Sequence, residues 1–146
     1  MVTVTAVQVQ VSQDETPGER LARVADWLTS CPAGDLVVLP ELWTVGAFDI
    51  EAMLAEAQSL DGTFVATMRQ VARTLGTTVH AGSFPERHDA GVSNTSVVVG
   101  PDGDILATYR KIHLFGFDTG EATAVVAGTE IVQVPSALGP TGLTTC

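Results

Sequence analysis

Residues 36–39 of the chain form an unbroken apolar run, Leu-Val-Val-Leu, that stops at Pro40 and Glu41. A short run without polar alternation is typical of a strand that is covered on both faces. The segments on either side of it are amphipathic, because the apolar residues of 19–30 and 63–75 recur at helical spacing. Helices that alternate with a strand of this kind predict an α/β fold.

The rest of the chain supplies more strands. The dipeptide Asp102-Gly103 lies between two apolar runs and predicts the turn of a hairpin. A hairpin beside a buried strand indicates a mixed sheet with parallel and antiparallel pairs. We predict helices at 19–30, 49–57 and 63–75, a glycine-rich loop at 116–128, strands at 2–11, 36–39, 77–84, 93–99, 105–109 and 130–134, and the start of another strand at 142–146.

Composition limits the class of protein and its partners. The 146 residues are 45% hydrophobic and carry a formal net charge of −10. Such a chain can bury a core, and its acidity argues against nucleic acids and anionic membranes, which require clustered Lys and Arg. No apolar run approaches the ~20 residues of a membrane span, and the N-terminus lacks a signal-peptide pattern. Because Cys31 and Cys146 are too few for a disulfide framework, we expect a cytoplasmic protein.

Three residues break the pattern around them and are candidates for chemistry. Glu41 lies at the carboxyl end of a buried strand, where ligands bind in α/β sheets. Lys111 is the only lysine among seven cationic residues, which favours a task that needs a compact ammonium. Cys146 follows a flexible Gly-Pro-Thr-Gly segment. The alternative interpretations are a solvated loop acid, an exposed lysine and a buried apolar cysteine.

Together, a carboxylate base, a cation and a thiol are sufficient for nucleophilic attack on a carbonyl or nitrile carbon. The thiol must lose its proton, the attacked group gains a negative heteroatom, and the leaving amine must be protonated. The chain has no phosphate-binding glycine loop, and its three histidines lack the spacing of metal ligands. We therefore expect no cofactor and no metal.

Three motifs follow one another along essentially the whole chain. The first is 40–43 (Pro-Glu-Leu-Trp). The second leads from 93–96 (Ser-Asn-Thr-Ser) through 100–103 (Gly-Pro-Asp-Gly) to 109–115 (Tyr-Arg-Lys-Ile-His-Leu-Phe), and the third is 142–146 (Gly-Leu-Thr-Thr-Cys). In this order they resemble the nitrilase superfamily of carbon–nitrogen hydrolases. The stretch at 110–115 is most similar to the ω-amidase-like branch of that superfamily.

The resemblance implies a triad of Glu41, Lys111 and Cys146. Glu41 is then the general base, Lys111 stabilises the oxyanion with a backbone N–H, and Cys146 is the nucleophile that forms a thioester. Many members have a second glutamate between the lysine and the cysteine, for which Glu121 is the first candidate and Glu130 the second. The implied fold is a four-layer α-β-β-α sandwich that forms dimers or higher homo-oligomers, and the implied substrate is a small linear carboxamide.

Catalytic members of the superfamily are roughly twice as long as this chain. We therefore expect residues 1–146 to be the N-terminal portion of a single hydrolase domain, inactive or insoluble in isolation. A nitrilase or an N-carbamoyl amino acid hydrolase is an alternative, because the triad does not distinguish these reactions. A non-catalytic α/β interaction domain is the alternative from another class.

Overall fold

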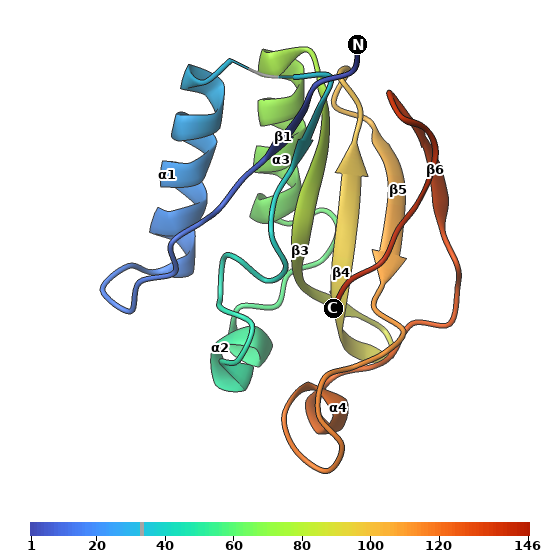
Figure 1. The fold of residues 1–146 in the computed structure, drawn as a ribbon. Helices are drawn as coiled ribbons and strands as arrows, with labels where there is room; N and C mark the ends of the chain where they lie inside the picture. Colours follow the sequence, from blue (N-terminus) through green and yellow to red (C-terminus); the bar gives the residue numbers. More distant parts are fainter. Residues whose placement is uncertain (33) are drawn as a thin grey trace.

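A mixed five-stranded sheet forms the centre of the computed structural model, which describes residues 1–32 and 34–146 (Figure 1). Its strands lie in chain order: β1 (Val4–Ala6), β2 (Leu36–Val38), β3 (Thr78–His88), β4 (Gly91–Val99) and β5 (Ile105–Arg110). The strands β1, β2 and β3 are parallel, whereas β3, β4 and β5 pair in antiparallel fashion. The predicted α/β fold with a mixed sheet is confirmed.

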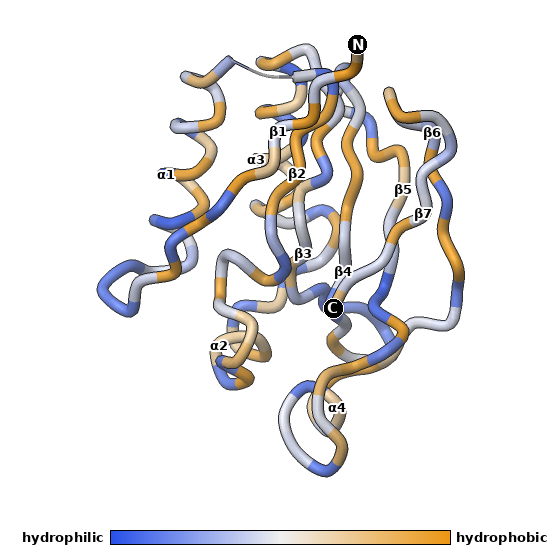
Figure 2. The backbone as a smooth tube through the Cα atoms, viewed as in Figure 1, coloured by the Kyte–Doolittle hydropathy of each residue, from blue (hydrophilic) through white to orange (hydrophobic). Residues whose placement is uncertain are grey.

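Two helices, α1 (Pro17–Ser30) and α3 (Thr63–Leu75), cover one face of the sheet (Figure 1). The helix α1 begins with a capping box between Thr16 and Glu19, and α3 ends at Gly76, whose φ of 61° is left-handed. No helix in the described ranges is long and apolar enough to cross a membrane. The main core lies between these two helices and the sheet, and many of the positions there are hydrophobic (Figure 2). It includes Val24, Leu28, Val37, Met68, Val71, Val79, Val97 and Val99.

The last part of the chain lies next to β4 and β5 (Figure 1). The strands β6 (Gln133–Ser136) and β7 (Gly139–Gly142) form a separate ribbon beside β5 (Figure 1). Near the C-terminus the hydroxyls of Ser96, in β4, and Thr145 are 2.9 Å apart. The short helices α2 (Ile50–Ala55) and α4 (Glu121–Ala124) lie at the end of the sheet where β2 and β3 end (Figure 1). This end therefore gathers chain segments that are far apart in sequence.

Several segments differ from their predicted extent; the strand predicted at 77–84, for example, continues to His88. The first strand covers only Val4–Ala6 of the predicted 2–11, because its partner β2 is three residues long. The strand predicted at 130–134 is displaced to Gln133–Ser136. A strand at 142–146 is wrong: β7 ends at Gly142, which pairs with the first residue of β6. The predicted loop at 116–128 contains the one-turn helix α4.

Candidate active site

A tight turn after β2 holds Glu41. The following residue, Leu42, has a positive φ of 45°, which is rare for a non-glycine residue. The Leu42 N–H donates to Ser83 Oγ over 3.0 Å, and the Ser83 N–H donates to the Pro40 carbonyl over 3.2 Å. An added Cβ on Gly82, whose φ is +70°, would overlap that carbonyl oxygen. The turn is therefore locked against an irregular stretch of β3, and this fixes the backbone at Glu41.

Lys111 comes directly after β5 and points into the protein, with a side chain that is 3% exposed. Its backbone N–H donates to the Asn94 carbonyl over 2.8 Å, and its own carbonyl accepts from the Gly128 N–H over 2.9 Å. Its Nζ donates to Glu41 Oε1 over 2.7 Å and to Glu121 Oε2 over 2.8 Å. One ammonium thus links carboxylates from two separate loops.

Glu121, the first residue of α4, has a side chain that is only 4% exposed. Its Oε2 also accepts from the Phe115 N–H over 2.9 Å, and its Oε1 accepts from Asn94 Nδ2 over 2.7 Å. The same Nδ2 donates to Glu41 Oε1 over 2.8 Å. The buried carboxylate of Glu121 therefore holds the glycine-rich loop against the sheet through its bonds to Lys111 and Asn94.

Hydrogen bonds decide the ionisation of Lys111 and Glu121. Burial by itself favours the neutral amine of Lys111, but the bonds to Glu121 and Glu41 outweigh it and raise the Lys111 pKa above its ordinary value. Burial likewise opposes the ionisation of Glu121, yet Lys111, the Phe115 N–H and Asn94 lower the Glu121 pKa below its ordinary value. The cluster thus holds a fixed ammonium, which is suited to stabilising an oxyanion.

Cys146 is exposed and lines a cavity of about 230 Å³ that Glu41 also borders. His80, Ser83 and Ser96 contribute further polar groups to this cavity. In the described residues no hydrogen bond joins Cys146 to Glu41 or Lys111. The structure therefore brings Glu41, Lys111 and Glu121 into one hydrogen-bonded cluster, and Cys146 and Glu41 both line one cavity.

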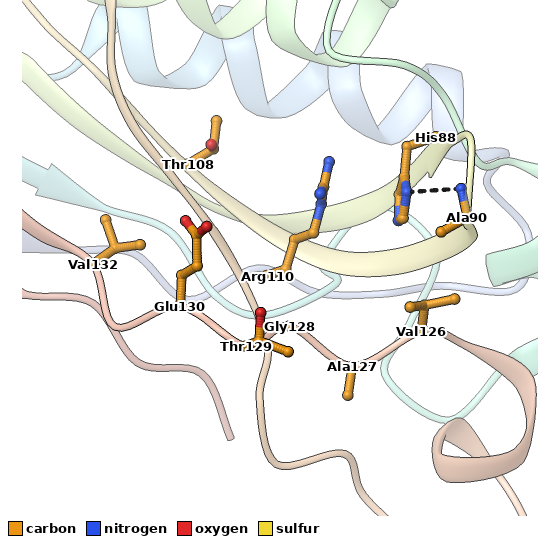
Figure 3. A pocket seen from close by; sticks show the side chains of 10 residues that line it. All are labelled: His88, Ala90, Thr108, Arg110, Val126, Ala127, Gly128, Thr129, Glu130 and Val132. Carbon is orange, nitrogen blue, oxygen red and sulfur yellow. Dashed lines mark hydrogen bonds between the residues drawn. The ribbon is translucent and has the colours of Figure 1, made fainter.

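Glu130 lies elsewhere, in a cavity of about 290 Å³ that Arg110 and His88 also line (Figure 3). Arg110 donates from Nε and Nη2 to the two carboxylate oxygens of Glu86 over 2.8 and 2.7 Å. Of the two candidates for the second glutamate, it is Glu121 that contacts Lys111. Within residues 1–32 and 34–146, no group of three or more His, Cys, Asp or Glu side chains is placed to hold a metal ion.

The family model described as carbon-nitrogen hydrolase matches residues 3–146. The chain belongs to the carbon-nitrogen hydrolase family. The resemblance predicted from the three motifs is therefore confirmed. Among carbon-nitrogen hydrolase structures, XC1258 from Xanthomonas campestris, which has an arsenic adduct in its active site, matches this fold with a TM-score of 0.87. It is 30% identical, and the match covers 99% of this chain and 53% of that one, so the nitrilase-like fold is also confirmed.

Amidases are among the curated proteins with similar sequences. The 2-oxoglutaramate amidase of Paenarthrobacter nicotinovorans is 38% identical, over 98% of this chain and 51% of the relative. The chloroplastic omega-amidase of Arabidopsis thaliana is 30% identical, over 95% of this chain and 40% of the relative. The chain spans about half the length, or less, of these relatives.

Asn94 is a residue of the candidate site that the sequence did not predict. It lies within a motif that carried the resemblance, but no role was predicted for it. One signal was present: Asn94 is a polar residue in the middle of a strand that continues as Val97-Val98-Val99. A wholly buried amide in such a strand requires polar partners, and here these are the two carboxylates.

Proposed function

We propose that the complete protein hydrolyses the C–N bond of small linear carboxamides, with Glu41, Lys111 and Cys146 as its catalytic residues. Residues 1–146 would be the N-terminal portion of this single catalytic domain. The observation that supports the proposal most directly is the ammonium of Lys111, held 2.7 Å from Glu41 and 2.8 Å from Glu121. A buried cation beside a cavity that a carboxylate and a thiol share can activate a nucleophile and stabilise an oxyanion.

In the first half of the reaction, Cys146 Sγ attacks the amide carbon and its proton passes to Glu41. The carbonyl oxygen becomes an oxyanion, which Lys111 stabilises through its fixed positive charge. When the tetrahedral intermediate collapses, the C–N bond breaks and Glu41 returns the proton to the leaving nitrogen. Ammonia departs, and the acyl group stays on Cys146 as a thioester.

In the second half, water attacks the thioester carbon while Glu41 accepts one of its protons. A second oxyanion forms at the same carbonyl oxygen, again opposite Lys111. Its collapse breaks the C–S bond and releases the carboxylic acid, and the proton returns from Glu41 to the Cys146 thiolate. Glu121 touches none of the reacting atoms in this scheme; it keeps Lys111 in place and charged.

The substrate class is proposed from the relatives, which carry the names 2-oxoglutaramate amidase and omega-amidase. The direct test is ammonia release by the complete protein from linear ω-carboxamides such as 2-oxoglutaramate, from aliphatic nitriles and from N-carbamoyl amino acids. We expect the carboxamides to give the highest kcat/KM. A preference for nitriles or carbamoyl compounds would replace the amidase assignment by one of the two alternatives.

Glu41→Gln tests the mechanism, because it keeps the shape of the side chain and removes the base. We expect its kcat to fall by about 100-fold or more. Glu130→Gln, in the separate cavity beside Arg110, is the matched substitution and should leave kcat unchanged. Full activity of Glu41→Gln would exclude the proposed chemistry.

The proposed setting is the cytoplasm, with a homo-oligomer as the active form and without nucleic acid or membrane partners. Cys31 and Cys146 are both free thiols in the structure, which suits a reducing compartment. The charge of −10 disfavours polyanionic partners. Ile131 and Leu138 are apolar side chains on the surface that a second subunit could cover. Light scattering of the complete protein and fractionation of its native cells test these points.

A further inference from the structure

Asn94 lies in the middle of β4 and is completely buried. Its backbone carbonyl accepts from the Lys111 N–H over 2.8 Å, so that β4 and the first residue after β5 are in register at this point. Its side chain extends to the cluster in which Lys111 meets the two carboxylates. One residue thus contacts all three charged members of the cluster.

The side-chain amide of Asn94 divides its donors between the carboxylates. Nδ2 donates to Glu41 Oε1 over 2.8 Å and to Glu121 Oε1 over 2.7 Å. The amide oxygen Oδ1 is buried, and none of the residues 1–32 and 34–146 is its hydrogen-bond partner. An unpaired buried carbonyl costs free energy, but rotating the amide would place that oxygen against two carboxylates. Its orientation is therefore set by Glu41 and Glu121.

The charge balance explains why a neutral donor suits this position. Two carboxylates share a single ammonium, so the cluster has an excess negative charge and its carboxylates repel each other. An amide that donates to both of them offsets this repulsion without adding a second cation. Lys111 therefore remains the only cation that an oxyanion would meet in this cluster.

The hydrogen bonds to Glu41 are also unevenly distributed. Those from Lys111 and from Asn94 both end on Oε1, and Oε2 accepts none from any residue that the structure describes. The Glu41 side chain is 20% exposed and borders the cavity that Cys146 lines. With Oε1 held by two donors, Oε2 is the oxygen left for proton transfer.

We propose that Asn94 is a positioning residue that anchors Glu41 through Oε1, keeps Glu121 on Lys111, and so leaves Oε2 of Glu41 available as the base. This inference rests on the proposed amidase function. It assigns Asn94 no contact with the substrate. Its effect must therefore appear in kcat and in the pH dependence rather than in substrate binding.

The test is Asn94→Ala in the complete protein, assayed by ammonia release. We expect kcat to fall between about 10-fold and 100-fold, as for a misplaced catalytic group, with KM little changed. The acid limb of kcat/KM should move to higher pH, because Glu121 loses the Asn94 donor that helps to lower its pKa. The other groups that face Glu121, the Lys111 ammonium and the Phe115 N–H, remain in place.

Two further variants separate positioning from folding. Asn94→Ser keeps a hydroxyl that can serve one carboxylate and should have a kcat between those of Asn94→Ala and the wild type. Thr95→Val is the matched control, since the neighbouring Thr95 is equally buried and donates over 2.7 Å to Glu86, a carboxylate outside the cluster. Thr95→Val should lower stability while its kcat and acid limb stay those of the wild type.

Each outcome bears on one of the two proposals. If Glu41→Gln is inactive while both Asn94 variants keep the wild-type kcat and acid limb, the role of Asn94 is overturned and the amidase function stands. If both Asn94 variants fail to fold while Thr95→Val folds, Asn94 is a structural residue and the inference is again overturned. If Glu41→Gln retains full activity, it is the proposed function that fails.

Discussion

Lys111 Nζ lies 2.7 Å from Glu41 Oε1, although seventy residues separate the two in the chain. Glu41 follows β2 and Lys111 follows β5, and the strands β3 and β4 lie between these two in the sheet. The turn after β2 is held against β3 by Ser83, which forms hydrogen bonds with Pro40 and Leu42, the two residues on either side of Glu41. The ion pair therefore depends on the order of the strands and on one irregular turn.

Lys111→Arg should keep the positive charge and lose most of the activity, by about 100-fold or more in kcat. The ammonium donates to carboxylates 2.7 and 2.8 Å away from one atom, whereas a planar guanidinium distributes its donors over a larger fork. Ammonia release by the complete protein measures the effect. Arg23→Lys, on the exposed side of α1, is the control for the reverse exchange: it replaces the guanidinium fork on Glu15, outside the cluster, and should leave kcat unchanged. Near-normal turnover of Lys111→Arg would mean that the site does not require the compact ammonium of Lys111.

Gly82→Ala should destabilise the protein by more than about 2 kcal/mol and also reduce kcat. The new Cβ would overlap the Pro40 carbonyl, and the φ of +70° is unfavourable for alanine. Gly139→Ala is the matched control, because Gly139 has a φ of +93° but open space around it, and it should cost about 1 kcal/mol. Urea midpoints and kcat of both variants give the comparison. Equal losses of stability and of kcat in the two variants would mean that the backbone at Glu41 can shift without cost.

The sequence predicted the architecture better than the details of the site. The apolar run before Glu41, the Asp102-Gly103 turn and the helical periodicities are local signals, and each corresponds to an element of the structure. The contacts of Asn94 with Glu41 and Glu121 were beyond prediction, because they join β4 to two loops that no periodicity brings together. The one-turn helix α4 was missed for a similar reason: its first residue is fixed by Lys111 and not by local propensity.

Glu121→Gln should lower the free energy of unfolding by about 1–3 kcal/mol at pH 7, because a charged partner of Lys111 becomes neutral. The Glu121 pKa is lowered in the folded protein, so its carboxylate stabilises the fold above the ordinary value of 4.5. This stability is lost as the pH falls through the lower, folded value. The difference between wild type and Glu121→Gln should therefore be constant between pH 7 and pH 5 and shrink below pH 4.5. Urea denaturation across this range measures it, and a difference independent of pH would mean that the Glu121 carboxylate is not responsible.

Iodoacetamide at neutral pH should label Cys146 stoichiometrically and in preference to Cys31. Cys146 is exposed and shares a cavity with Glu41, whereas Cys31 is a half-buried residue that caps the end of α1. If Glu41 accepts the thiol proton, Glu41→Gln should slow labelling at Cys146, since the thiolate is the reactive form. Cys31 is the internal control, and its rate should be the same in both proteins. Peptide mass spectrometry over a time course gives the two rates separately. Equal, slow labelling of both cysteines in the wild type would count against Cys146 as the nucleophile and in favour of a non-catalytic domain.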